Sequence, residues 1–301
     1  HSMSSARDFQ ERDLRAARNF GAAARDAGME RFIYLGGLGE PRLDLSPHLR
    51  SRHEVGKTLA QYGIPLVEFR SAIIVGSGSA AFEMMRYTVE GMPLLFCPPW
   101  VNTRIQPISV RDVLDYLIAA LELEPEQVGD HCVVEIGGAD VITYHDMMRG
   151  YARRRDLRRP MVTLPYLPLR LCATLLHWIT PIPPPLAYAL IEGMRNEVIV
   201  RNDSALRLFP HIHPRPYDVS LERALARITT DRVETTWSDA QYSTTGDLVL
   251  VTFTTSEGLL FETRQKLTSA PAEVVFKGFT GLGGKRGWVF ADWVWLARGI
   301  I

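Results

Sequence analysis

The first half of the chain alternates between amphipathic segments and short apolar runs. An opening helix that ends at Gly28 is predicted by apolar residues at helical spacing, namely Phe9, Leu14, Ala17, Phe20, Ala24 and Ala27. The apolar run at residues 31–36 predicts a buried strand. A second helix is expected from Ser46 to about Tyr62, because Pro47 suits a first helical turn and Gly63 follows.

The same alternation continues to about residue 154. Further helices are expected at residues 79–90, 110–123 and 143–154, and Leu114, Leu117, Ile118 and Leu121 share one face of the second of these. Strands that alternate with helices favour right-handed crossovers and a parallel sheet with helices on both faces. We therefore predict an α/β fold with at least three parallel strands, Phe32–Leu35, Pro65–Ile74 and Cys132–Ile136.

The pattern changes twice in the second half. After Pro160 the sequence is helical and interrupted by prolines, up to about Ile228. Val249–Thr255 and Leu259–Leu267 then alternate β-branched and polar residues, which is typical of antiparallel strands, and a helix is expected at residues 271–279. A boundary between about 228 and 245 predicts two domains, residues 1–228 and an α+β domain at 229–301. The second is expected to be incomplete, because it ends soon after the aromatic segment at 288–295.

Composition excludes several classes of partner. Lys plus Arg and Asp plus Glu are both 34, and this balance gives no field that attracts nucleic acid or an anionic membrane. Three cysteines without C-x-x-C spacing fit a cytoplasmic, reducing location. The apolar stretch 164–191 contains charge and prolines, so we expect buried helices there, with a membrane-surface contact as the alternative and no integral span. His211 and His213 have no third ligand nearby, so no metal site is predicted.

Four segments carry a resemblance to a known family: His1–Met3, Phe32–Gly39, Ser46–Glu54 and Arg70–Ser79. They resemble atypical short-chain dehydrogenase/reductases of the NmrA-like and complex-I-associated branch, over residues 1–228. Residues after about 230 are similar to the start of a helix-grip accessory domain. The resemblance implies a partial Rossmann-type sheet, a helical substrate-side region and an NAD or NADP cofactor.

The resemblance also implies that the family's first three strands and its G-x-x-G-x-x-G phosphate-binding loop lie upstream of His1. We therefore expect this chain alone to bind a dinucleotide poorly, and a protein extended upstream by about 75 residues to bind it. Gly76 and Gly78 match G-x-G-x-x-A, but the acidic residue that the dinucleotide fingerprint requires about 20 positions later is absent, so this turn is expected at the substrate side.

The family's catalytic Tyr-x-x-x-Lys corresponds here to His48 and Arg52, one helical turn apart. Arg52 could hold a ribose or phosphate oxygen and His48 could transfer a proton; a solvated helix face is the alternative. Gly36 and Gly37 take the place of the family's usual Ser, which argues against ordinary alcohol dehydrogenation. They allow close approach of either the cofactor or the next helix.

The resemblance assigns further residues to the site. Cofactor-binding positions are His1, Ser2, Gly36, Gly37, Arg52, Arg70, Ser71 and Ile74, and substrate-side positions are Ser77, Ser79, Phe82, Glu83 and Arg86. Glu83 and Arg86 are three residues apart, so they could instead pair only with each other.

Three functions remain open. The first is an NAD(P)-dependent oxidoreductase or epimerase-like enzyme that acts on a small or lipophilic molecule. The second is a non-catalytic dinucleotide-binding regulator or assembly factor, which the altered His48 and Arg52 pair suits equally well. The third is binding of a lipophilic ligand by the C-terminal domain.

Overall fold

The computed structural model describes residues 9–40, 44–165, 168–180, 182, 184–229, 250–256, 259–265 and 268–280. His1, Ser2 and the aromatic segment at 288–295 lie outside these residues. The chain divides into two compact units, residues 1–241 and 242–301, which we describe separately. No helix among the described residues is long and apolar enough to cross a bilayer.

Twenty-one helices and strands are described in the first unit. In chain order they are α1 (Phe9–Asp26), β1 (Phe32–Gly37), α2 (Pro47–Ala60), β2 (Leu66–Ser71), β3 (Ile74–Val75), α3 (Ala80–Gly91), β4 (Leu95–Cys97), η1 (Pro99–Asn102), β5 (Arg104–Ile105), β6 (Ile108–Ser109), α4 (Val110–Ala119), η2 (Ala120–Glu122), α5 (Pro125–Val128), β7 (His131–Ile136), β8 (Ile142–Thr143), α6 (Tyr144–Arg154), β9 (Met161–Thr163), α7 (Leu169–Ile179), α8 (Pro184–Gly193), α9 (Ser204–Leu208) and α10 (Tyr217–Thr229).

The main sheet is parallel and has the order β1-β2-β7, which confirms the predicted α/β fold with three parallel strands. The predicted single strand Pro65–Ile74 is wrong. β2 ends at Ser71, and the next strand, β3, pairs with β6 instead. The Ile108 amide donates to the Ile73 carbonyl (2.9 Å), so the chain changes its hydrogen-bonding partner within the segment that was predicted as one strand.

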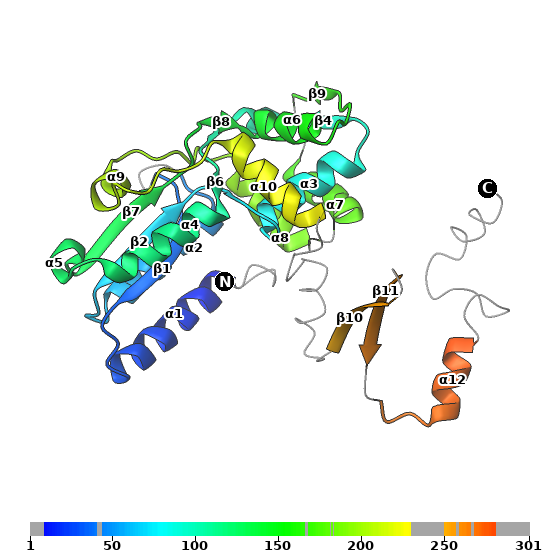
Figure 1. Ribbon diagram of the computed structural model, residues 1–301, viewed down its shortest axis with the longest axis horizontal. Helices are drawn as coiled ribbons and strands as arrows, with labels where there is room; N and C mark the ends of the chain where they lie inside the picture. The colour runs from blue at the N-terminus through cyan, green and yellow to red at the C-terminus, as the bar shows by residue number, and fades with distance from the viewer. Residues whose placement is uncertain are drawn as a thin grey trace. The chain divides into compact units, whose positions relative to one another are not determined.

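Helices cover both faces of this sheet (Figure 1). Leu66 of β2 packs with Phe32 and with side chains of α1 and α2 on one face. The next residue, Val67, packs with Val113 of α4 on the other face, because successive side chains of a strand point to opposite sides. The central strand β2 is therefore buried on both faces, as expected for a parallel strand between two layers of helices.

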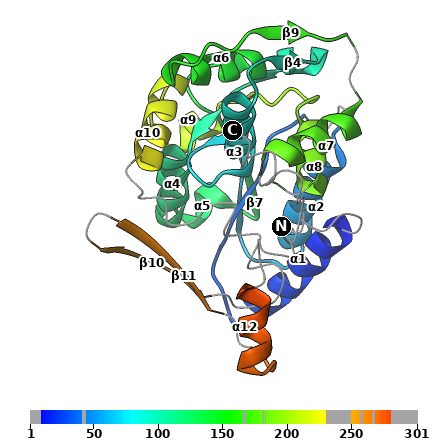
Figure 2. The same cartoon turned by 90° about the vertical axis from the view of Figure 1, so that its right-hand side faces the viewer.

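A third apolar core holds the helical region beside the sheet. It is built from α3, α6, α8 and α10, with Phe82, Tyr151 and Ile182 among its fully buried side chains. α7 and α8 lie side by side in this region (Figure 2). Of the two helices in the apolar stretch 164–191, α8 is buried as the sequence predicted, with Leu186, Ala187 and Ile191 in the core. The prediction holds only in part for α7, where Leu171, Leu175 and Trp178 are 46%, 49% and 80% exposed.

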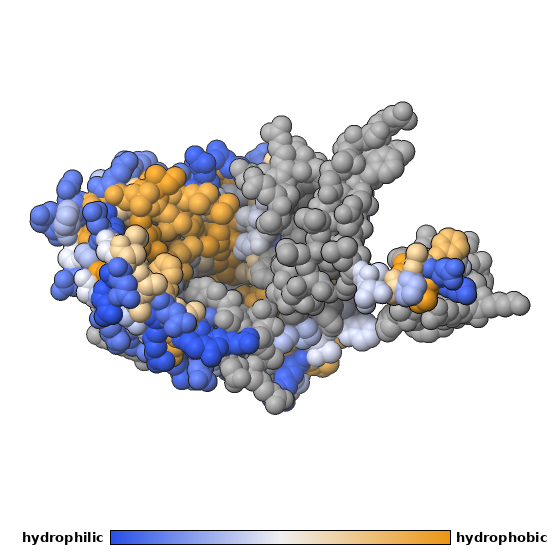
Figure 3. Space-filling model, turned by 90° about the horizontal axis from the view of Figure 1, so that it is seen from below, coloured by the Kyte–Doolittle hydropathy of each residue, from blue (hydrophilic) through white to orange (hydrophobic). Residues whose placement is uncertain are grey.

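The apolar face predicted for residues 110–123 does not face the core. α4 buries Val113 and Tyr116 against the sheet, whereas Leu114, Ile118 and Leu121 are 44%, 58% and 68% exposed. Apolar side chains gather on one exposed face of this unit (Figure 3). Helical periodicity predicted the helix, but it could not tell which of two apolar sides meets the sheet.

The second unit contains β10 (Leu250–Ser256), β11 (Leu259–Gln265) and α12 (Ala272–Thr280). β10 and β11 are antiparallel, with Leu250 opposite Gln265. The predicted antiparallel pair and the helix that follows it are confirmed for the described residues. The helix-grip assignment stays a prediction.

Candidate functional site

A cavity of about 310 Å³ opens at the carboxyl ends of β1 and β2, beside α2. Ligands of parallel α/β sheets bind at this edge. The predicted site residues that line it are Gly36, Gly37, His48, Arg52, Ser71, Ile74 and Ser79. Residues spread over more than forty positions of sequence therefore meet in one place.

The other predicted residues lie elsewhere. Arg70, Ser77, Phe82, Glu83 and Arg86 do not line this cavity or the apolar cavity described below. His1 and Ser2 lie outside the described residues, so their assignment stays a prediction.

The start of α2 fixes the direction of His48 and Arg52. Ser46 caps the helix by accepting a hydrogen bond from the Leu49 amide (3.4 Å), and Pro47 occupies the first turn. The side chain of Asn196 accepts from the Ser46 amide and donates to the Asp44 carbonyl, which attaches this turn to the end of α8. His48 and Arg52 then follow on successive turns of a fixed helix.

His48 is a neutral group at physiological pH. Burial lowers the pKa of His48 to about 4, and the opposing effect of Asp13 is smaller. Its Nδ1 is buried and has no hydrogen-bond partner among the described residues. A neutral imidazole in this position can donate or accept one hydrogen bond toward a ligand in the cavity.

Arg52 is buried and charged. Its side chain is 9% exposed, and its Nη1 lies 3.9 Å from Oδ2 of Asp13 on α1, which is itself 4% exposed. Burial lowers the pKa of Arg52 to about 9, so the guanidinium keeps its proton at neutral pH. This face of α2 is packed rather than solvated. The guanidinium supplies positive charge to the cavity wall and is partly compensated by Asp13.

Close packing accounts for Gly37. A Cβ at this position would lie 2.9 Å from Cδ2 of Leu49 and 3.5 Å from Cγ of Arg52. The missing side chain therefore lets α2 approach the end of β1. The glycine pair could allow close approach of either the cofactor or the next helix. At Gly37 the contacts directly support approach of the helix α2.

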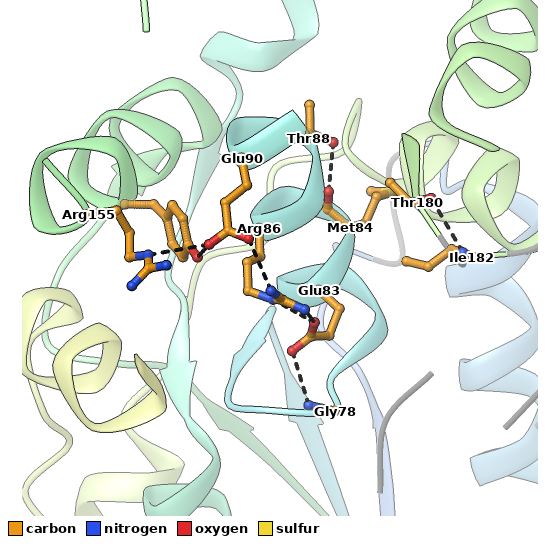
Figure 4. Close-up of polar contacts among 10 residues, drawn as sticks. Gly78, Glu83, Met84, Arg86, Thr88, Glu90, Arg155, Thr180 and Ile182 are labelled. Carbon is orange, nitrogen blue, oxygen red and sulfur yellow. Dashed lines mark hydrogen bonds and ion pairs between the residues drawn. The ribbon is translucent and has the colours of Figure 1, made fainter. Parts of the chain in front are cut away.

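The backbone at the start of α3 is hydrogen-bonded to the carboxylate of Glu83, a residue of the same helix (Figure 4). The Gly78 amide donates to Oε1 of Glu83 (3.4 Å), and Arg86 pairs with Oε2 of Glu83 (2.7 Å) and with Glu90 (3.1 Å). Glu90 also accepts from the Tyr151 hydroxyl. Glu83 and Arg86 thus pair with each other, and a carboxylate already lies where a pyrophosphate would need to bind.

Arg70 is held on the β2 strand by a neighbour. Its Nε donates to Oε1 of Glu68 at 2.6 Å, and Oε2 of the same carboxylate lies 2.8 Å from Nε2 of His131. Glu68 is fully buried. The Arg70 guanidinium is therefore committed to this buried pair.

Tyr144 is a site residue that the sequence did not reveal. It is the first residue of α6, is 7% exposed and lines both the cavity at the strand ends and an adjacent apolar cavity. Its hydroxyl has no hydrogen-bond partner within the described part of the chain. Burial raises the pKa of Tyr144 well above its usual value, so the hydroxyl stays protonated. Only the Thr143 capping box marked this position in sequence, and it marks many helices that have no site.

Acidification is expected to destabilise the fold through His48. The unfolded side chain titrates near 6.5 and the folded one near 4, so the unfolded state binds more protons between these values and stability falls as pH falls through this window. From pH 7 to 5, His48→Gln should lose about 1–2 kcal/mol less stability than the natural chain. Urea unfolding at both pH values measures this. Equal losses in the two proteins would contradict this prediction. Burial also lowers the pKa of His53, so the double variant His48→Gln/His53→Gln serves to separate the contribution of His53 from that of His48.

Comparisons with known proteins show the fold. No protein-family model matches the chain, and no curated protein is similar to it in sequence. Solved structures do match. A nucleoside-diphosphate-sugar epimerase from Staphylococcus aureus has a TM-score of 0.53 at 16% identity, over 68% of this chain and 69% of its own. UDP-glucuronic acid 4-epimerase from Bacillus cereus, in complex with UDP-glucuronic acid and NAD, has a TM-score of 0.52 at 15% identity, over 72% and 67%.

A dehydrogenase matches equally well. L-threonine dehydrogenase from Phytophthora infestans has a TM-score of 0.51 at 10% identity, over 73% of this chain and 71% of its own. At these identities the likeness concerns the fold and not the activity. The first unit of the chain therefore has the Rossmann-type α/β fold of these epimerases and of this dehydrogenase.

Proposed function

We propose that the protein is an NAD(P)-dependent oxidoreductase or epimerase-like enzyme of the atypical short-chain dehydrogenase/reductase type. The observation that carries the proposal is the convergence of Gly36, Gly37, His48, Arg52 and Ser71 on one cavity at the carboxyl ends of parallel strands. Support comes from structural neighbours that were solved with NAD bound. The free thiols Cys97, Cys132 and Cys172 are compatible with a reducing cytoplasm.

The cavity suits one end of the dinucleotide. Arg52 and His48 present polar groups for a ribose, and Leu35, Leu38 and Ile74 give an apolar surface for a nicotinamide ring. The glycine-rich turn at Gly76 and Gly78 lies between β3 and α3, and the Gly78 amide already donates a hydrogen bond to the Glu83 carboxylate. These residues fit the nicotinamide and ribose end and do not provide a pyrophosphate loop.

A bound nicotinamide would supply hydride transfer. The chain's own residues would then orient the substrate, exclude water and handle one proton. Tyr144, protonated and at the edge of the cavity, is placed to donate a proton to a substrate oxygen. His48 is neutral, so it would act by holding a hydroxyl group rather than as a cation.

Arg52→Ala should weaken dinucleotide binding by the complete protein, meaning the protein extended upstream of His1, by about 1–3 kcal/mol. This is the usual cost of losing a charge-assisted hydrogen bond. Fluorescence titration with NADH and NADPH measures this and also distinguishes the two cofactors. Arg52→Lys keeps the charge and the pairing with Asp13, so it should lose less.

Arg50→Ala is the matched control, because Arg50 lies on the same helix with its side chain 59% exposed. It should bind dinucleotide like the natural protein. If Arg52→Ala also binds with unchanged affinity while remaining folded by circular dichroism, the cofactor assignment of this helix is wrong.

The attachment of Arg52 to Asp13 favours a second candidate function. A guanidinium that is already paired and a histidine that stays neutral suit a protein that senses a dinucleotide without turning it over. Saturable NADH binding without oxidation in the presence of carbonyl compounds would support this function. Ligand binding by the C-terminal unit stays a prediction from the sequence.

A further inference from the structure

A second cavity, also of about 310 Å³, lies beside the first, between α3, α6, α7 and α8. Six of the chain's nine methionines line it: Met84, Met85, Met92, Met147, Met148 and Met194. Among the described side chains of its wall there is no Asp, Glu, Lys, Arg or His. Its volume falls within the range of small-molecule sites, which extends from about 300 to 1,000 Å³.

This wall is unsuited to a nucleotide sugar. A diphosphate needs cationic side chains or unoccupied helix amides, and a sugar needs several hydrogen-bond partners; burial without them costs several kcal/mol, about 2–7 for one polar group. Methionine side chains are flexible and polarizable, so they adapt to apolar ligands of irregular shape. The wall therefore favours a hydrocarbon or aromatic group.

The polar groups of the wall include hydrogen-bond donors. Tyr144 lines both cavities, together with Ile73, Ala81 and Met194, so the two spaces adjoin at this residue. Within the described chain its hydroxyl has no partner, and the buried Nε1 of Trp100 also has none. Unpaired donors in an apolar wall are costly unless a ligand supplies an acceptor. An uncharged oxygen, such as a carbonyl, meets this requirement.

We propose that the apolar cavity binds the hydrocarbon part of an uncharged, lipophilic carbonyl compound and that its oxygen lies against Tyr144, next to the cavity that holds the nicotinamide. This assignment of the substrate class rests on the proposed function for its reaction, but binding to the cavity does not require the cofactor. A nucleotide sugar, the ligand of some structural neighbours, is excluded as the occupant.

Binding can be measured with the full chain and no added dinucleotide. Nile red serves as the fluorescent probe, and unlabelled 2-undecanone and UDP-glucose serve as competitors. 2-Undecanone should displace the probe and UDP-glucose should not. Displacement by UDP-glucose alone, or by neither compound, would overturn the proposal.

The mouth of the cavity offers a matched pair of variants on α7. Leu175 lines the cavity and is 49% exposed, whereas Leu171, one turn earlier, is 46% exposed and does not line it. Leu175→Glu places a carboxylate at the mouth and should weaken 2-undecanone binding about tenfold, while Leu171→Glu should change it less than about twofold. Equal effects of the two variants would locate the ligand elsewhere on the surface.

Tyr144→Phe tests the orientation of the ligand, because it removes only the hydroxyl. It should weaken 2-undecanone about tenfold and leave undecane unchanged, as expected for one lost hydrogen bond. Equal weakening of both compounds, or of neither, would contradict the placement of the oxygen. A chain that binds the ketone while the complete protein fails to bind NADH would refute the proposed function and leave this cavity assignment in place.

Discussion

Tyr144→Phe is expected to lower the turnover of a lipophilic ketone by the complete protein about 10²–10³-fold and to leave dinucleotide affinity within about twofold. In the reduction of a carbonyl, a bound dinucleotide would supply the hydride to carbon, and the oxygen would need a proton from the protein. Tyr144 carries a proton at neutral pH and lies where the two cavities adjoin, so it can donate that proton in the transition state. Phenylalanine preserves the packing and removes the donor.

Tyr151→Phe is the control for this experiment. Tyr151 lies two turns further along α6, its hydroxyl donates to Glu90 and it lines neither cavity. It should retain turnover within about threefold, since exchange of a phenol for a benzene ring away from the site removes one hydrogen bond. His48→Gln should affect dinucleotide affinity more than turnover, because His48 lines the cavity proposed for the nicotinamide and ribose and not the apolar cavity. If it abolishes turnover while Tyr144→Phe remains fully active, the proton donor is His48 and not Tyr144.

The sequence predicted the sheet because buried parallel strands leave a local signature. The predicted strands Phe32–Leu35 and Cys132–Ile136 lie within β1 and β7. They could be recognised because strands of a parallel sheet are rich in apolar residues. The break between β2 and β3 left no such signature. The residues of β2 and β3 are buried or partly buried on both sides of the break, and the change of hydrogen-bonding partner after Ser71 involves only the backbone.

The candidate site was predicted where it depends on local spacing and missed where it depends on tertiary contacts. His48 and Arg52 share a cavity wall because they lie one turn apart on α2. The commitment of Arg70 to Glu68 could not be inferred, since the third partner, His131, comes from another strand. Tyr144 lines the cavity from α6, and no sequence pattern near Tyr144 predicts this position.

The buried ion cluster on β2 should control the stability of the first unit. Glu68 is fully buried and accepts from Arg70, whose side chain is only 12% exposed. Glu68→Ala would leave this guanidinium without its carboxylate in a place that water reaches poorly. Removal of one partner of a buried pair costs about 3–5 kcal/mol, and we expect the free energy of unfolding to fall by this amount.

Urea unfolding followed by circular dichroism measures the loss, and Glu54→Ala provides the comparison. Glu54 pairs with Lys57 at 2.8 Å on α2, but both side chains are about half exposed, so its loss should cost less than about 1 kcal/mol. The double variant Glu68→Ala/Arg70→Ala should recover part of the stability, because it removes the uncompensated charge as well. Additive losses in the double variant, or a cost of Glu68→Ala no larger than that of Glu54→Ala, would show that the buried pair does not stabilise the sheet.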